Sequence, residues 1–157
     1  MIKKGIILAG GLGQRMSPIT KAVNKQLLPL YDKPLIFYPL SILMLANIKN
    51  ILIIVNKGQV NTFRRILPEK NNLGIKIQYA EQKKPRGLPD AFIIGRKFID
   101  KDNVALVLGD NFFYGQSLTK NLRKNLIFSK GARIFLHPVK NPQRYGVAYL
   151  DKKKKNT

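Results

Sequence analysis

Short runs of apolar, mostly β-branched residues alternate along the chain with segments whose apolar positions recur at helical spacing. The runs are expected to be strands and cover residues 5–9, 51–55, 75–79, 104–108 and 133–137. Helices are expected over residues 35–46, over residues 59–67, from Leu88 or Pro89 onward, and from Ser117 as N-cap to about Phe128. Strands that alternate with helices in this way are typical of βαβ units. We therefore predict an α/β, Rossmann-like fold with a mostly parallel sheet and helices on both faces.

The first predicted strand runs directly into a glycine-rich turn. Gly10, Gly11 and Gly13 follow the apolar run, and glycine lets the backbone approach an anion that a Cβ would keep away. Arg15 and Lys25 can then reach that anion, one as a planar fork of donors and the other as a flexible point charge. The glycine spacing is neither that of a dinucleotide fingerprint nor that of a P-loop. The pattern predicts a polyphosphate cradle, and a tight strand-to-helix connection with two solvated cations is the alternative.

Three other loops follow predicted strands, at residues 81–87, 109–111 and 144–146. Open α/β sheets bind ligands at the carboxyl ends of their strands, where such loops gather. Asp110 emerges there after Gly109, and a carboxylate suits Mg²⁺, which is usually held by one or two carboxylates together with substrate phosphates. Spacing alone leaves open that Asp110 only caps the following turn.

Composition narrows the class of protein. At 157 residues and 45% hydrophobic content we expect one domain over residues 1–151 and a lysine-rich tail over residues 152–157. The absence of cysteine excludes disulfides, a thiolate nucleophile and a cysteine-ligated metal. The longest apolar stretch, residues 35–48, is interrupted and too short to span a bilayer, and the N-terminus lacks a secretory pattern, so we expect a cytoplasmic protein without a membrane partner. The net charge of +21 raises nucleic acid as a partner, but the lysines are scattered and no aromatic stacking platform accompanies them. We therefore expect no nucleic-acid partner.

Several motifs together resemble one family. Residues 5–25, followed by QLLP at 26–29 and YDKP at 31–34, look like the signature of the sugar-1-phosphate nucleotidyltransferases, and LGDN at 108–111 matches another motif of that family. The resemblance extends from Lys4 to about Asp151. It implies a fold of the nucleotide-diphospho-sugar transferase type. The implied reaction is transfer of a thymidylyl group from dTTP to glucose 1-phosphate, which gives dTDP-glucose and pyrophosphate.

The resemblance also implies a role for each matching residue. Arg15 and Lys25 would be catalytic, and Asp110 would be one of two aspartates that bind Mg²⁺. Gly10, Gly11 and Gly13 would bind the nucleotide phosphates together with Arg15. Gln82 and Gly87 would read the base, and Tyr145 and Gly146 would contact the sugar. Arg86 and Asp90 depart from the family pattern near the base-reading residues, so the base preference stays open. Gln14 is a further departure, between the glycines and Arg15. His137, the only imidazole, is given no role.

Members of that family continue with a Glu-Lys segment that grips the sugar phosphate and with a second metal-binding aspartate. We therefore expect this chain to be incomplete at its C-terminal side, to expose apolar surface and to aggregate. A homo-oligomer or a complementing C-terminal chain is a possible partner. A uridylyl- or other sugar-phosphate nucleotidyltransferase and a non-catalytic nucleotide-binding remnant remain as alternatives. A basic nucleic-acid-binding module is the least favoured one.

Overall fold

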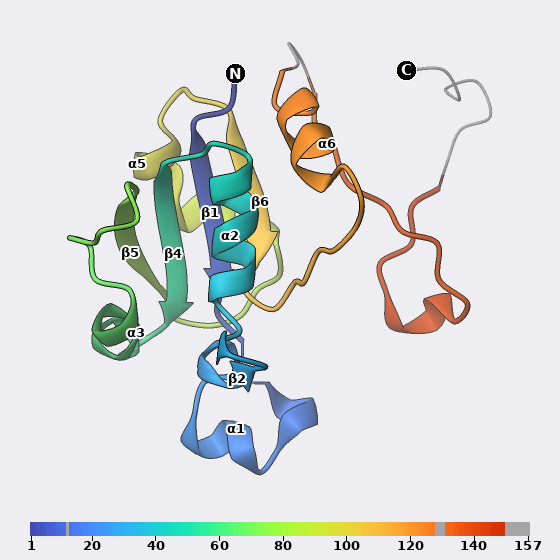
Figure 1. The fold of residues 1–157 in the computed structure, drawn as a ribbon. Helices are drawn as coiled ribbons and strands as arrows, with labels where there is room; N and C mark the ends of the chain where they lie inside the picture. The colour runs from blue at the N-terminus through green and yellow to red at the C-terminus, as the bar shows by residue number, and fades with distance from the viewer. Residues whose placement is uncertain (12, 128–130, 150–157) are drawn as a thin grey trace.

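The computed structural model describes residues 1–11, 13–127 and 131–149. Its main sheet has four parallel strands in the order β5-β4-β1-β6 (Figure 1). These strands are β1 (Lys4–Ala9), β4 (Asn50–Asn56), β5 (Lys76–Gln82) and β6 (Val104–Leu108), and a small antiparallel pair is formed by β2 (Pro29–Leu30) and β3 (Lys33–Pro34). The chain proceeds outward from β1 to β5 and then returns to the other side of β1. The strand order therefore reverses between β1 and β6.

Helices cover both faces of the sheet, as predicted. The helices are α1 (Ile19–Ala22), α2 (Phe37–Leu45), α3 (Val60–Ile66), α4 (Pro89–Ile94), α5 (Arg96–Ile99) and α6 (Leu118–Lys124), with 3-10 turns η1 (Gln14–Met16), η2 (Lys25–Leu27) and η3 (Pro142–Arg144). Residues of α2, α3 and α6 pack into one core cluster, and residues of α4 and α5 pack into another. In Figure 1, α2 lies in front of the sheet and runs roughly along its strands. Among the described residues, no helix is long and apolar enough to cross a lipid bilayer.

Strand β1 shows why the sheet is buried on both sides. Ile7 and Ala9 belong to the cluster with α2, α3 and α6, whereas Ile6 and Leu8 belong to the cluster with α4 and α5. Successive side chains of a strand point to opposite faces, so an uninterrupted apolar run fits a sheet that is covered on both faces. The first four predicted strands are confirmed as β1, β4, β5 and β6. Strand β5 begins one residue later than predicted and extends to Gln82.

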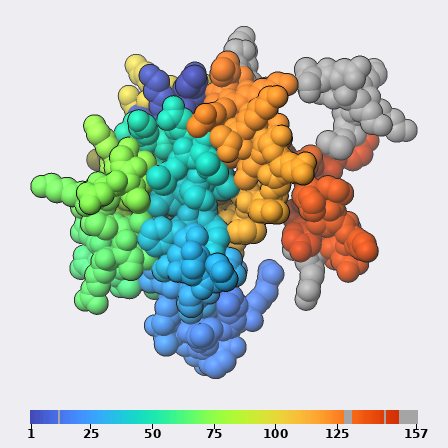
Figure 2. All heavy atoms as spheres, in the orientation of Figure 1, coloured from blue at the N-terminus to red at the C-terminus, as the bar shows by residue number. Residues whose placement is uncertain are grey.

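The predicted strand over residues 133–137 is wrong. Those residues adopt no regular structure, and Ile134, Phe135 and Leu136 are each more than half exposed. A strand exists only through hydrogen bonds to a neighbouring strand, and an apolar run does not supply that neighbour. Figures 1 and 2 show residues 131–149 at the side of the molecule, beyond α6.

The predicted helices exist, with shorter bounds. Ser117 is the N-cap of α6 as predicted, but its backbone is left-handed, with φ of 58°, and its side chain makes no capping hydrogen bond. The helix ends at Lys124, and the predicted end, Phe128, lies outside the described residues. The preference of serine for N-cap positions therefore predicts the correct first residue, but a side-chain capping hydrogen bond is not what starts this helix.

Candidate functional site

The loops that follow β1 and β6 meet at the point where the strand order reverses. The backbone N–H of Gly109 donates to the carbonyl oxygen of Leu8 at 2.8 Å, which extends the pairing of the two strands to their carboxyl ends. Open α/β sheets bind ligands at such a switch point. A cavity of about 460 Å³ lies there, and its lining includes the predicted residues Gly10, Gly11, Gly13, Arg15, Lys25 and Asp110.

Lys25 and Asp110 form an ion pair at this cavity. The Lys25 Nζ and Asp110 Oδ2 atoms are 2.7 Å apart, and the two side chains are 30% and 34% exposed. Lys25 begins the turn η2, and Asp110 follows β6 after one glycine. A ligand that brings an anion to the ammonium and a cation to the carboxylate can separate this pair without leaving either charge unpaired.

Arg15 is the cation that remains available. It lies in the turn η1 and is exposed at the rim of the cavity. Among the described residues, no carboxylate is paired with Arg15, and no group of three or more histidines and carboxylates gathers that would hold a metal. Among the described residues, the cavity lining therefore offers a guanidinium without a carboxylate partner and the carboxylate of Asp110, a combination that favours an anionic ligand.

Two glycines of the loop are required by close contacts. Gly13 has φ of 58°, and a Cβ there would lie 2.8 Å from Cγ2 of Thr20, whose hydroxyl donates to the Gly13 carbonyl at 2.9 Å. A Cβ on Gly10 would overlap Oε1 of Gln82. Gly11 differs from both, because its N–H donates to Oδ1 of Asn56 at 3.0 Å. The Gly11 N–H is thus not open to a phosphate in this structure, although the glycine pattern predicts a phosphate cradle.

Gln82, a predicted base reader, is the last residue of β5 and not part of the following loop. Its side chain is 3% exposed, and its Nε2 donates to Oδ2 of Asp90 at 2.7 Å. Because a carboxylate only accepts hydrogen bonds, the amide nitrogen faces Asp90 and the amide oxygen faces Gly10. Gly87 lies in the loop beyond, with φ of 92°, and Pro85 of that loop lines the cavity. The loop after β5 therefore borders the cavity, although neither Gln82 nor Gly87 lines it.

Tyr145 and Gly146 are not brought to this site. Tyr145 follows the turn η3 and is 64% exposed, and neither residue lines the cavity. Both belong to the segment beyond α6 (Figure 1). Their contact with a sugar stays a prediction.

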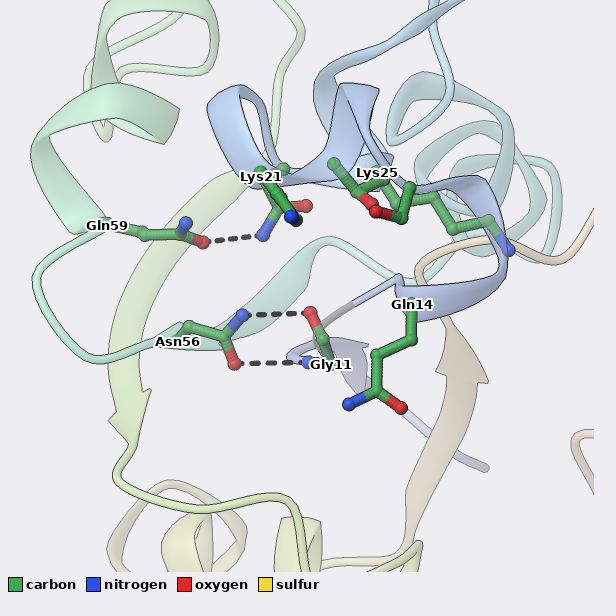
Figure 3. A pocket seen from close by; sticks show the side chains of 9 residues that line it. Gly11, Gln14, Lys21, Lys25, Asn56 and Gln59 are labelled. Carbon is green, nitrogen blue, oxygen red and sulfur yellow. Dashed lines mark hydrogen bonds between the residues drawn. The ribbon is translucent and has the colours of Figure 1, made fainter.

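Three amide residues at the site were given no role from the sequence. Asn56 and Gln59 line a second cavity of about 550 Å³, which shares Gly11 and Lys25 with the first (Figure 3). Gln26 lines the first cavity, is 5% exposed, and its Oε1 has no hydrogen-bond partner among the described residues. One signal for Asn56 was available, because it is the polar residue that ends the apolar run of β4 and so lies at the ligand edge of the sheet.

The fold and this cavity define an α/β protein whose ligand site combines a glycine loop, a free arginine and a carboxylate at a strand-order switch point. Comparison of sequences assigns it more closely. The chain belongs to the nucleotidyl transferase family, whose model matches residues 4–156.

Named relatives agree with the family. The chain is 56% identical over 144 residues to the glucose-1-phosphate thymidylyltransferase of Neisseria meningitidis, covering 92% of this chain and 50% of the relative. It is 50% identical over 148 residues to the corresponding enzyme of Mycolicibacterium smegmatis, covering 94% and 51%. The chain thus spans about half the length of the relatives that it matches.

Solved structures show the same fold. A Bacillus anthracis protein described as a glucose-1-phosphate thymidylyltransferase, solved with sucrose, superimposes with a TM-score of 0.70 at 33% identity, covering 78% of this chain and 50% of that one. A UDP-glucose pyrophosphorylase in complex with UDP-glucose gives a TM-score of 0.62 at 27% identity, covering 80% and 54%.

Proposed function

We propose that this chain carries the nucleotide-binding half of an enzyme that transfers a thymidylyl group from dTTP to glucose 1-phosphate. The observation that carries the proposal is the convergence of the loop glycines, Arg15, Lys25 and Asp110 on one cavity. The names of the relatives support the substrates. We further propose the cytoplasm as the compartment.

The proposed chemistry asks little of the protein beyond alignment and charge. A sugar phosphate is ionised at neutral pH, so one of its oxygens can attack the α-phosphorus of dTTP while the bond to pyrophosphate breaks. Neither a general base nor a covalent intermediate is needed, and the barrier is lowered by holding both groups in line and neutralising their charge. Arg15 and the glycine loop would hold the triphosphate and the departing pyrophosphate. Lys25 would leave Asp110 to bind the α-phosphate and the incoming sugar phosphate.

The residues present fit a magnesium ion. Asp110 offers a partly exposed carboxylate at the cavity, and its partner Lys25 can turn to a phosphate when a metal takes the carboxylate. Mg²⁺ is commonly held by one or two carboxylates plus phosphate oxygens, so Asp110 and the nucleotide would share it. Bound there, the metal would offset the negative charge of the phosphates.

The sugar half of the site would come from elsewhere. Because the chain spans about half the length of its relatives, we propose that a C-terminal segment, either continuous with this chain or supplied by a complementing chain or second copy, provides the sugar-phosphate grip and the second aspartate. Without that segment the chain would bind nucleotide but turn over poorly.

The base is a separate question, since one solved relative binds UDP-glucose. The buried pair of Gln82 and Asp90 presents the amide oxygen of Gln82 toward Gly10, and an oxygen accepts from the N3–H that thymine and uracil share. We therefore expect Mg-dTTP and Mg-UTP to compete for the site and Mg-dCTP to bind more weakly. Stronger binding of Mg-UTP than of Mg-dTTP would favour a uridylyltransferase.

Calorimetric titration with Mg-dTTP tests the nucleotide half directly. The Arg15→Ala variant should bind at least about tenfold more weakly, because it loses a charge-assisted contact to phosphate. The matched control is Arg65→Ala, an exposed arginine of α3 that lies outside the cavity. Equal affinity of the Arg15 variant and the parent chain would remove Arg15 from the site, and absence of binding by the parent chain would contradict the proposed function as a whole.

A further inference from the structure

The turn between β4 and α3 reaches the glycine loop through one side chain. Asn56 accepts a hydrogen bond from the Gly11 N–H at 3.0 Å through Oδ1 and donates through Nδ2 to the Gly11 carbonyl at 2.9 Å. The carboxamide thus satisfies both polar groups of one glycine, in the manner of a neighbouring strand (Figure 3). Gly11 has φ of 126°, a conformation that no other residue type holds easily, and a Cβ there would meet nothing within 4 Å. Neighbouring atoms therefore do not confine this glycine sterically, and the two hydrogen bonds hold it.

A second amide of the same turn reaches the other side of the site. Gln59, the N-cap of α3, accepts a hydrogen bond through Oε1 from Nδ2 of Asn24. Asn24 is 8% exposed, and its Oδ1 accepts from the backbone N–H of Gln26 at 2.9 Å, which caps the turn η2. Lys25 lies between these two residues. Gln59 therefore holds the segment that carries the lysine of the ion pair.

We propose that Asn56 and Gln59 are positioning residues for the phosphate-binding groups of the site. This inference rests on the proposed nucleotide-binding function. Neither side chain lines the cavity that holds Arg15 and Asp110, so both act through Gly11 and through Asn24. One short turn thereby sets the glycine loop and the Lys25 turn relative to each other, and the Gly11 N–H serves the loop's shape while Gly10, Gly13, Arg15 and Lys25 face the ligand.

The geometry favours positioning over a direct contact with phosphate. In an Asn side chain that exchanges two hydrogen bonds with one peptide, one acceptor lone pair and one donor of the amide are already engaged. A loop held in this way loses less conformational entropy when an anion binds, because the loop already has the conformation that binds the anion. The two hydrogen bonds between Asn56 and Gly11 form a clamp on the loop. Removing this clamp should therefore weaken the binding of phosphate groups while the sheet stays folded.

Two measurements on the parent chain and its variants test the inference. The first is amide hydrogen exchange of Gly11 by NMR, and the second is calorimetric titration with inorganic pyrophosphate and with Mg-dTTP. The variants are Asn56→Ala, which removes both clamp bonds, and Gln59→Ala. The matched controls are Asn50→Ala, at the opposite end of β4, and Gln78→Ala, an exposed residue of β5. Neither control residue touches the site.

In the Asn56→Ala variant we expect Gly11 to exchange like an unprotected amide while the amides of β1 and β4 stay protected. The affinity for pyrophosphate should fall about tenfold or more, because a lost pair of hydrogen bonds at a partly buried peptide has that order of effect. Gln59→Ala should lower the same affinity without exposing Gly11, and the controls should match the parent chain. An Asn56→Asp variant keeps the acceptor for the Gly11 N–H, so it should retain protection there even if the alanine variant does not fold.

Unchanged pyrophosphate affinity in Asn56→Ala would overturn the inference, and so would an unprotected Gly11 amide in the parent chain. Failure of the parent chain to bind either ligand is a different result. It would contradict the proposed function itself, and this inference with it.

Discussion

At the scale of single residues, the negative charge of Asp110 would serve both the ion pair with Lys25 and a bound Mg²⁺. Asp110 pairs with Lys25, and it is the carboxylate that lines the cavity in the part of the chain that the structure describes. Asp110→Asn keeps the shape and removes the charge that attracts Mg²⁺. We expect dTTP binding to lose its dependence on Mg²⁺ and the fold to persist, as judged by calorimetry with and without the metal and by circular dichroism.

The control for that variant is Asp100→Asn, an exposed residue in the turn after α5 with φ of 54°, which asparagine also tolerates. Metal-dependent binding that is the same in Asp110→Asn as in the parent chain would leave Asp110 as a turn residue.

Tyr79 provides a second residue-scale prediction, on stability. Its hydroxyl donates to the carbonyl of Leu67 at 2.5 Å, and burial, with a smaller effect of Glu69, raises the pKa of Tyr79 above the ordinary value for tyrosine. A raised pKa in the folded state means that the stabilisation is complete below the unfolded-state pKa of about 10 and is lost as the pH rises further. Alkaline unfolding should therefore begin above that pH.

The Tyr79→Phe variant should lose about 1 kcal/mol of unfolding free energy at neutral pH with the hydrogen bond, and its stability should fall less steeply above pH ~10. Denaturant unfolding measured across the alkaline range checks both. Tyr114→Phe is the matched control, because Tyr114 is 92% exposed. An equal alkaline slope in the parent chain and in Tyr79→Phe would show that another group controls it.

At the scale of elements, the break between α4 and α5 lets these two helices approach the sheet closely. Gly95 separates the two helices, and a Cβ there would lie 2.9 Å from the Ala91 carbonyl oxygen and 2.9 Å from Cδ1 of Ile6. Gly95→Ala should destabilise the chain by about 1–3 kcal/mol, since overpacking forces backbone or core side chains to shift. Denaturant unfolding is the measurement.

Gly115→Ala is the control for Gly95→Ala, because a Cβ at Gly115 would meet nothing within 4 Å. Its stability should stay within about 0.5 kcal/mol of the parent chain. Equal stabilities of the Gly95 and Gly115 variants would mean that the helices can move away from the sheet at little cost.

At the scale of the whole molecule, apolar side chains remain exposed near and beyond the carboxyl end of β6. Phe112 and Tyr114 are 55% and 92% exposed, and Val147 and Tyr149 are 73% and 95% exposed. Exposed apolar groups of this size are typical of surfaces that are covered by another segment or partner. We expect the 157-residue chain to self-associate in light scattering and to synthesise dTDP-glucose poorly.

Supplying the C-terminal half of one of the related full-length enzymes, fused or as a second chain, should restore turnover and reduce the self-association. The same half added to the Asp110→Asn variant is the control and should restore far less activity. Robust synthesis by the isolated, monodisperse chain would show that this half needs no complement.

The sequence by itself determined the elements whose signals are local. Uninterrupted apolar runs identify β1, β4 and β6 because both faces of a parallel sheet are buried. The glycines after β1 identify the candidate ligand loop, because only glycine permits its backbone angles and close contacts. The rule that ligands bind at carboxyl ends of strands then placed Arg15 and Asp110 near one site.

Only the tertiary structure decided which side chains meet. Lys25 with Asp110, Asn56 with Gly11, and Gln82 with Asp90 are pairs between segments, and no periodicity encodes them. The apolar run at 133–137 has the composition of a strand, yet a strand needs a neighbour, and pairing is a property of the whole fold. Propensity depends on residues that are neighbours in the sequence, whereas hydrogen-bond partners in a sheet come from segments that are far apart in the sequence.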